Sequence, residues 1–480
     1  MDSQPHKGSR LRTLIFYVIA LTTATALFFL ILSAGSNLAT PVGVAVPAGA
    51  ATAPVAKDAL GHLLLALVVI IIAARTAGQL FRFLHQPPVI GEVLAGIMLG
   101  PSLLGAVLPE ASAFLLPVSI APHLGMIAQV GVILFMFLVG LELDTTILRE
   151  KAHSAVAISH ASILVPFLLG SAFALWLYPR YAVSTVPFTN FTLFLGISLS
   201  VTAFPVLARI LTDQGLNRSR LGAIALTCAA VDDATAWCLL AFVVGVVQAE
   251  SGAALRTILL TFAFVLVVVF LIRPLVQRWA KRVELSDPVG QGTVAIACVA
   301  FLLSALITEG IGIHALFGAF ILGAVIPHES RLARALKTKL EDIVVVLFLP
   351  VYFAFTGLRT QIGLLADWQD WLVTGVIILV ASLGKFGGSA ITARLTGISW
   401  RDAASLGILM NTRGLMELVV LNLGLDLGVI SPRLFAMLVI MALVTTLATT
   451  PVLHLLNRSG ASRRNNANSQ DDTAEVSSSP

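Results

Sequence analysis

Two adjacent aspartates, Asp232 and Asp233, lie near the middle of an apolar stretch (residues 221–247) that is long enough to cross a bilayer. A carboxylate at that depth costs about 2.5 to 3.5 kcal/mol on insertion scales, so such residues usually face a helix-bundle interior and bind ions or relay protons. The alternative is a structural role, in which hydrogen bonds within the bundle satisfy both carboxylates. The residue types favour binding of a small cation or a proton inside the membrane.

A lysine in another apolar stretch is the natural partner of the aspartates. Lys385 lies within Leu383–Gly388, and an ammonium at that depth needs a counter-charge or must lose its proton. The glycines around it allow a neighbouring helix to approach closely. We therefore expect Lys385 to pair with Asp232, which leaves Asp233 as the main ligand of a cation.

Three further ionisable residues, Glu92, Arg413 and Glu417, also fall inside apolar stretches. We expect them to form structural pairs rather than to bind the ion directly. The three cysteines show no metal-ligand spacing, and the chain contains no hydrolase, phosphate-binding or metal motif. The sequence therefore predicts no cofactor, no enzyme activity and no metal site beyond one for an alkali cation that passes through.

The composition identifies the class of protein that must position these residues. Apolar residues make up 58% of the chain and charged residues 11%, and the mean hydropathy is +0.95, which is far outside the range of soluble domains. We predict an all-α polytopic membrane protein with about 13 transmembrane helices plus an N-terminal apolar segment. The apolar stretches centre in residues 14–34, 60–81, 88–108, 124–142, 153–178, 190–212, 219–247, 254–277, 291–308, 311–327, 342–361, 371–395, 402–425 and 431–456.

We predict three regions along the chain. Residues 1–59 hold the first apolar segment and a linker rich in Pro and Ala, residues 60–457 form the transmembrane domain, and residues 458–480 form a disordered tail. The first segment is either a cleaved signal or a retained helix. Its apolar run of about 20 residues exceeds the usual core of a signal peptide, which favours a retained helix.

The positions of the cations predict the orientation, because short cytoplasmic loops carry the excess of Lys and Arg. Most loop cations fall on one side of the count, which we take as cytoplasmic together with the C-terminus. The net charge of +5 then reflects topology, and no binding of nucleic acid is expected. The loops on this side hold Arg149/Lys151, Arg218/Arg220, Arg278/Lys281/Arg282, Arg331/Arg334/Lys337/Lys339, Arg394/Arg401 and Arg458/Arg463/Arg464.

Two short matches between the halves of the chain predict an internal repeat. Gly96–Gly100 in the third apolar stretch resembles Ala319–Gly323 in the tenth, and Phe137–Glu142 in the fourth resembles Phe353–Arg359 in the eleventh. Both matches are displaced by seven stretches. An odd displacement makes the two copies cross the membrane in opposite directions, which is the inverted-topology repeat of secondary transporters.

The sixth and thirteenth stretches correspond under this repeat, and both carry signals for a broken helix. Pro205 cannot donate a backbone hydrogen bond and restricts the residue before it. In the other stretch Asn411, Thr412 and Gly414 place polar groups and a flexible residue at hydrocarbon depth. Crossed discontinuous helices would expose dipole ends and free carbonyls at the midplane. The alternative is a proline kink and a packed polar patch.

These segments resemble the monovalent cation:proton antiporters of the Kef and plant cation/H+ exchanger branch, within the sodium/hydrogen exchanger superfamily. The resemblance covers about residues 60–457. It implies a homodimer in the cell membrane, with a core domain of crossed broken helices beside a dimerisation domain. The matching runs are Pro87–Pro101, Thr202–Arg209, the Asp pair, Lys339–Asp342 with the following Gly357-Leu358, and Asn411–Leu418.

The resemblance implies exchange of Na+ or K+ for protons by alternating access. Asp233, with Thr202 and carbonyls of the broken helices, would hold a dehydrated cation, and protonation would release it. Plant exchangers of this branch usually have Asn-Asp where this chain has Asp232-Asp233, while a double aspartate with a lysine at Lys385 resembles the electrogenic exchangers. Ion preference and stoichiometry therefore stay open, and the alternatives in function are a gated cation channel and a sodium-coupled carrier of organic anions.

Overall fold

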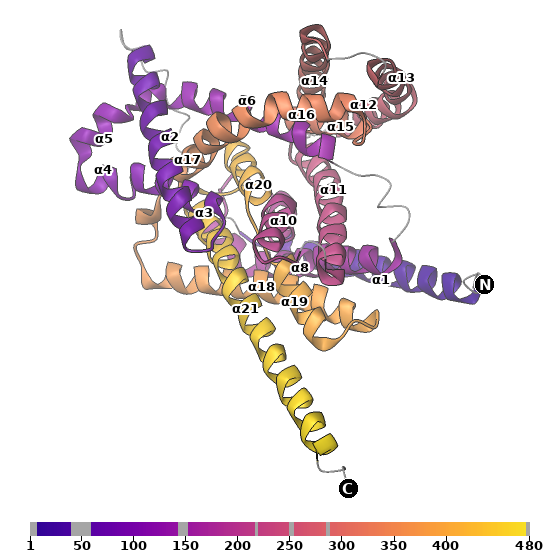
Figure 1. Cartoon of the computed structure of the whole chain (residues 1–480). Coiled ribbons are helices and arrows are strands. Elements are labelled where there is room, and N and C mark those ends of the chain that lie inside the picture. Colours follow the sequence, from indigo (N-terminus) through magenta and orange to yellow (C-terminus); the bar gives the residue numbers. More distant parts are fainter. Residues whose placement is uncertain are drawn as a thin grey trace.

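The computed structural model describes residues 7–39, 59–142, 152–216, 219–248, 254–284 and 289–476. All regular structure in these ranges is helical, and they contain no strand (Figure 1). Residues 40–58, which include most of the predicted linker, and the cations Arg149, Lys151 and Arg218 lie outside the described residues.

The first half of the chain contains long helices and two interrupted ones. In chain order the elements are α1 (Lys7–Gly35), α2 (Ala59–Phe83), α3 (Pro88–Leu99), α4 (Leu104–Val107), α5 (Pro109–Leu115), η1 (Val118–Ile120), α6 (Ala121–Glu142), α8 (Ala152–Tyr181), α9 (Phe188–Ser198), α10 (Phe204–Asp213) and α11 (Arg220–Gln248).

The second half repeats this pattern. Its elements are α12 (Ala254–Val267), η2 (Val268–Ile272), α13 (Arg273–Glu284), α14 (Gln291–Ile311), α15 (Ala315–Val325), α16 (Arg331–Ile343), η3 (Val344–Phe348), α17 (Leu349–Arg359), η4 (Ile362–Leu364), α18 (Trp368–Leu395), α19 (Trp400–Met410), α20 (Leu415–Asp426) and α21 (Pro432–Val476).

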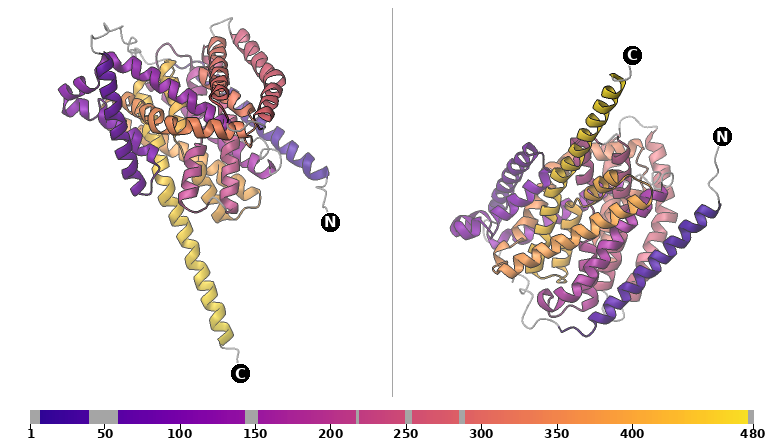
Figure 2. Two further views of the ribbon diagram at one scale, coloured as in Figure 1. Left: turned by 45° about the horizontal axis from the view of Figure 1, so that its top comes forward. Right: turned by 90° about the horizontal axis from the view of Figure 1, so that it is seen from below.

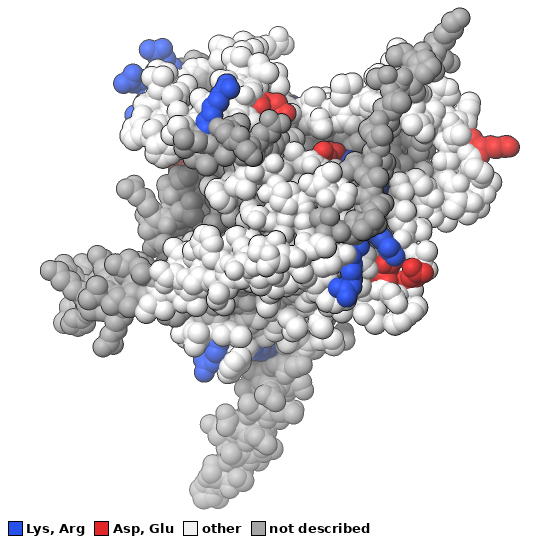
Figure 3. Space-filling model, turned by 180° about the vertical axis from the view of Figure 1, so that it is seen from behind, with Lys and Arg blue, Asp and Glu red and all other residues white. Residues whose placement is uncertain are grey.

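The helices confirm the predicted membrane fold. Within the described ranges, 10 helices are long and apolar enough to cross a membrane, or 11 when the bent pair α19 and α20 is taken as one span. Shorter apolar helices at Ile19–Gly35, Phe188–Ser198 and Ala315–Val325 account for the remaining predicted stretches. On the face shown in the space-filling view, the described residues are largely uncharged, with a few charged side chains in separate places (Figure 3).

The two sequence matches mark two equivalent helix crossings. α3 crosses α17 where the backbones of Gly96 and Gly357 meet, and α6 crosses α15 where Gly140 meets Gly323. A Cβ atom on Gly357 would lie 2.6 Å from the carbonyl carbon of Gly96, and one on Gly140 would lie 2.9 Å from the Cα of Gly323. Only glycine fits at such distances, so the repeated Gly motifs are the contact points of an inverted repeat.

The remaining packing follows the same symmetry and divides the helices into two bundles. We call α8, α9, α10, α11, α18, α19, α20 and α21 the core bundle, and α2, α3, α6, α14, α15, α16 and α17 the scaffold bundle. α8 packs along α18, and α8 with α9 has its counterpart in α18 with α19. Each half therefore contributes to both bundles, and neither half forms one alone.

The N-terminal helix lies at the edge of this assembly, whereas the C-terminal helix runs through the core bundle before it projects from it (Figure 2). α1 runs along α8, where the rings of Phe28 and Phe167 lie 5.5 Å apart. α21 leaves the core and continues to Val476, across the segment predicted as a tail. The Ser/Asn/Asp composition there offers no apolar face for packing, which is why we predict disorder beyond residue 458. That disorder and the division into three regions stay predictions.

Candidate functional site

Two broken helices meet at the centre of the core bundle. α9 ends at Ser198 and α10 begins at Phe204, with Pro205 in the first turn of α10, where its missing N–H costs no hydrogen bond. α19 ends at Met410 and α20 begins at Leu415, with a bend of 42° between them. The interruptions lie where the sequence predicts them. They are joined directly, because the Ala203 N–H donates to the Thr412 carbonyl at 3.0 Å.

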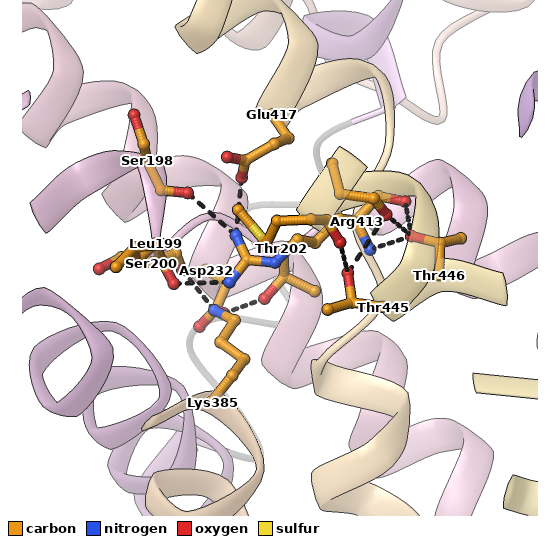
Figure 4. A network of polar contacts seen from close by, with 12 residues as sticks. Ser198, Leu199, Ser200, Thr202, Asp232, Lys385, Arg413, Glu417, Thr445 and Thr446 are labelled. Atoms are coloured by element: carbon orange, nitrogen blue, oxygen red, sulfur yellow. Dashed lines mark hydrogen bonds and ion pairs between the residues drawn. The ribbon is translucent and has the colours of Figure 1, made fainter. Parts of the chain in front are cut away.

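Asp232, on α11, is surrounded by donors. Its carboxylate accepts hydrogen bonds from the hydroxyls of Ser159, Ser162 and Thr202, each at 2.6 Å, and from Lys385 Nζ at 3.0 Å. Asp232 and Lys385 are both fully buried. The predicted pairing of these two residues is therefore present, and the Asp232 charge is compensated inside the bundle (Figure 4).

Lys385 has more acceptors than its three protons require. Besides Asp232, it lies within hydrogen-bond distance of the Ser162 carbonyl at 3.0 Å, the Ser162 hydroxyl at 3.2 Å and the Ser200 carbonyl. Gly384 brings the lysine helix close to α8, because a Cβ atom there would lie 2.8 Å from the Cα of Pro166. Gly384 thus allows the close approach that we expected, and this approach positions Lys385 between α8 and the end of α9.

Asp233 is buried like Asp232 but differs from it in its hydrogen-bond partners. It is 3% exposed, yet neither carboxylate oxygen has a hydrogen-bond partner of ordinary geometry among the described residues. The polar group that faces it is the backbone amide of Phe204, at the positive end of the α10 dipole. Both oxygens of Asp233 therefore have lone pairs to offer, whereas Glu417 has one unpartnered oxygen and uses the other to bind Arg413. Thr202, which we expected beside Asp233, directs its hydroxyl to Asp232 instead.

Unpartnered oxygens also occur at the second break. Asn411 Oδ1 and Thr412 Oγ1 are buried and have no hydrogen-bond partner within the described part of the chain. Amide and hydroxyl oxygens are hard ligands of the kind that replace the hydration shell of an alkali cation. The described residues contain no group of three or more His, Cys, Asp or Glu side chains that could hold a resident metal.

Arg413 connects the two breaks. Its guanidinium donates to the carbonyls of Ser198 at 3.0 Å and Leu199 at 2.8 Å, and it pairs with Glu417 at 2.8 Å. The two carbonyls belong to the free end of α9, where the helix dipole is negative, so a cation stabilises that end. Thr446 holds the Arg413 backbone, since it bonds both the N–H at 3.0 Å and the carbonyl at 2.8 Å. Figure 4 shows this pair beside Lys385 and Asp232.

Glu92 lies away from this group. It is on α3 in the scaffold bundle, is 8% exposed, and faces α2, where its Cγ and Oε1 atoms lie 3.5 Å from the Cβ position of Gly78. The structure therefore brings together Asp232, Asp233, Lys385, Arg413 and Glu417 of the predicted ionisable residues and leaves Glu92 outside. Arg413 and Glu417 form the structural pair that we expected.

Sequence reasoning missed the serines that position Asp232. Ser159 and Ser162 are three residues apart on α8, so they lie on one face of that helix, and this spacing is the signal that was available. The carbonyls of Ser198, Leu199 and Ser200 carry no signal in the sequence, because their role depends on where α9 stops.

Comparison with known proteins identifies the family of the membrane region. Residues 63–456 match the family model described as "Sodium/hydrogen exchanger, transmembrane". The chain is 44% identical over 394 residues to the Na(+)/H(+) antiporter NhaS4 of Synechocystis sp., which covers 82% of this chain and 96% of that protein. It is 40% identical to cation/H(+) antiporter 17 of Arabidopsis thaliana over 85% of this chain, which is 50% of the plant protein.

A solved structure shows the same fold. The sodium proton antiporter MjNhaP1 from Methanocaldococcus jannaschii superposes with a TM-score of 0.59 at 14% identity, over 84% of this chain and 97% of that one. This likeness supports the architecture, and the family match together with the Synechocystis relative shows the family. The chain belongs to the sodium/hydrogen exchanger family of membrane antiporters, as its broken helices and paired aspartates led us to expect.

Proposed function

We propose that this protein exchanges a monovalent cation for protons across the membrane by alternating access, with Asp233 as the site for which cation and proton compete. The observation that carries the proposal is the contrast between neighbouring carboxylates. Asp232 receives four donors, whereas Asp233 is equally buried and has none of ordinary geometry. A buried carboxylate with free lone pairs is stable only when it holds a cation or a proton.

The coupling follows from the cost of moving charge through hydrocarbon. With a cation or a proton bound, Asp233 is neutral and the core bundle can cross between its two positions. With the site empty, the charged carboxylate makes the crossing costly. The cycle therefore carries a cation one way and a proton the other. Asn411 and Thr412 supply further oxygens for the cation, and Thr202 acts through Asp232.

The transported ion is proposed as Na+, because the relative that this chain covers almost completely carries that ion in its name. The protein is proposed to reside in the cell membrane as a homodimer, with its cation-rich loops and its C-terminus in the cytoplasm. The dimer is supported by the family resemblance, and the orientation by the loop charges. Whether the Asp232–Lys385 pair opens and moves a second proton is a question for the experiment below.

The test is proton flux into proteoliposomes that contain an internal pH dye, after pulses of Na+, K+ or Li+. Asp233→Asn should abolish cation-dependent proton movement, because an amide cannot exchange a proton. Glu110→Gln, an exposed carboxylate on α5, is the matched control and should exchange at the wild-type rate. Loss of activity in both variants, or retention in both, would remove the role of Asp233.

The same preparation separates the alternatives. A cation channel would conduct Na+ rapidly with no obligatory proton movement, and an organic-anion carrier would require an added anion. Flux measured with the membrane voltage clamped and then left free reports the stoichiometry. A rate that is independent of voltage means one proton per cation, and a voltage-dependent rate means that Lys385 releases a proton as well.

A further inference from the structure

Polar side chains join the scaffold bundle to the core bundle on the side proposed to be external. Tyr352, Thr356 and Arg359 lie on one face of α17, since they are separated by four and three residues. They face Asn422 and Asp426, which are four residues apart on α20. Within the described structure, the backbones of α17 and α20 approach each other at few other points. We call these five residues the α17–α20 latch.

The latch is closed by direct bonds. Arg359 contacts Asp426 Oδ1 at 2.5 Å and Asn422 Oδ1 at 3.1 Å, and the Asn422 amide donates to Thr356 Oγ1 at 2.7 Å and to the Tyr352 hydroxyl oxygen at 3.2 Å. Asn422 is 6% exposed. Both ends of its carboxamide are therefore used across the seam, which makes the contact sensitive to any sliding of α20 past α17.

The internal repeat identifies the equivalent positions on the cytoplasmic side. Aligning Gly140 with Gly357 places Glu142 at the position of Arg359, and aligning Thr202 with Thr412 places Thr212 at the position of Asn422. Glu142 pairs with Lys337 of α16 at 2.5 Å, within the scaffold bundle. The Thr212 hydroxyl donates to Ala208 of its own helix at 2.9 Å. Neither of these contacts joins the two bundles.

A cavity occupies the seam on that side. It has a volume of about 340 Å³ and is lined by residues of α6, α10 and α16, among them Glu142, Phe204 and Lys337. Phe204 is the first residue of α10, and its backbone amide faces Asp233. The cavity thus reaches from the cation-rich side to the immediate neighbour of the proposed ion site, while the opposite seam is closed by the latch.

We propose that the α17–α20 latch is the gate of the external route to Asp233, and that Arg359 and Asn422 are positioning residues of the exchange cycle that must separate before a cation is exchanged with the outside. At the two equivalent cytoplasmic positions that the structure describes, Glu142 and Thr212, no contact joins the bundles, so the state with the cytoplasmic side open is favoured at rest. This inference rests on the proposed function and orientation.

A reversible cross-link tests the gate. Thr356→Cys with Asn422→Cys replaces two side chains whose polar atoms lie 2.7 Å apart, in a protein whose three native cysteines are changed to alanine. Oxidation should abolish exchange, and reductant should restore it. Binding of Na+ to the oxidised protein in detergent should persist, because the cytoplasmic cavity stays open. The two single-cysteine variants should exchange equally under both conditions.

Two results would overturn the gate. If the oxidised double-cysteine protein exchanges as fast as the same protein in reductant, exchange does not require the latch to open. If oxidation abolishes Na+ binding, the cross-link damages the ion site itself. Failure of the proposed function is seen separately, since the wild type would then show no cation-dependent proton flux at all.

A second pair of variants needs no cysteines. Arg359→Gln removes the ion pair, so the externally open state becomes more populated. In vesicles of known orientation, the half-saturating Na+ concentration on the external face should fall by about threefold to tenfold, the effect of one such contact. The value on the cytoplasmic face should rise by much less, because the state that is open to that face is already the favoured one. The charge swap Arg359→Asp with Asp426→Arg should restore both values. Equal shifts on the two faces would mean a merely structural role.

Discussion

The two aspartates have different roles because neighbouring residues on a helix point about 100° apart. Asp232 faces α8 and Lys385, where donors from two other helices converge on it. Asp233 faces the start of α10 instead. One carboxylate is therefore compensated within the bundle, and the other keeps unpartnered oxygens, as the proposed ion site requires.

Removing one member of the Asp232–Lys385 pair should lower the stability far more than replacing both members. Asp232→Ala leaves a fully buried ammonium without its counter-charge, a loss of about 3 to 5 kcal/mol. Asp232→Ala with Lys385→Met removes both charges, so it should recover most of that loss. The measurement is the midpoint of thermal unfolding in detergent. A double variant as unstable as Asp232→Ala alone would show that the serines, rather than the pair, hold this region together.

Arg413 should not tolerate a change to lysine. Its guanidinium contacts two carbonyls and a carboxylate at once, and an ammonium cannot match that planar geometry. We expect Arg413→Lys to lower the exchange rate per folded protein by about tenfold or more, the cost of unpaired buried groups. Glu417→Gln should be milder, because Arg413 keeps both carbonyls. Equal losses in the two variants would mean that the ion pair, not the end of α9, is what matters.

Much of this chemistry could be read from residue types, and the rest depended on the arrangement of the helices in space. Asp232 and Lys385 are predictable partners, because both are charged at membrane depth and each needs the other. The hydrogen bond of Thr202 to Asp232 rather than to Asp233 was not predictable, since it depends on the direction in which the chain leaves α9. The same holds for the contact of Arg413 with α9, which joins residues 214 positions apart.

At the scale of elements, the glycine crossings set how closely the helices of the scaffold bundle approach. Gly357 and Gly140 have backbone atoms of the opposing helix where a side chain would start. The sequence matches that contain them are therefore repeated for a packing reason, and they could be found without any structure. The helix breaks were likewise predictable, because Pro205 and Gly414 do not continue a helix.

Alanine should destabilise the protein at a glycine of a helix crossing but not at a glycine with free space around it. Gly140→Ala or Gly357→Ala should lower stability by about 1 to 3 kcal/mol through overpacking, seen as a lower unfolding midpoint and less folded protein in the membrane. Gly387→Ala is the control, since nothing lies within 4 Å of its Cβ position, and alanine is the better helix former by about 1 kcal/mol. A crossing glycine that accepts alanine without loss would show that the helices can move apart freely.

At the scale of the whole molecule, the two halves are interlocked. α3 and α6 of the first half cross α17 and α15 of the second, α8 packs along α18, and the two breaks are bonded to each other. The first half thus contains Asp232 without Lys385, and the second contains Arg413 without the end of α9 that it caps.

Splitting the chain should expose this dependence. A break in the connection between α11 and α12 gives two fragments that should each fail to accumulate as folded protein, because buried charges lack partners. Expressing both fragments together should restore cation-dependent proton flux in membrane vesicles. Stable accumulation of either fragment alone would mean that each half folds independently.

The charges buried in the core bundle also limit the gradients that this protein can sustain. Asp232 cancels Lys385, and Glu417 cancels Arg413. If Asp233 is the exchange site, as proposed, and both pairs stay closed, the occupant of Asp233 alone determines the charge that moves. Every cation is then exchanged for one proton, and at equilibrium the concentration ratio of the cation across the membrane equals that of the proton. A cell with no pH difference could drive no uphill transport of the cation through this protein, whatever its membrane potential.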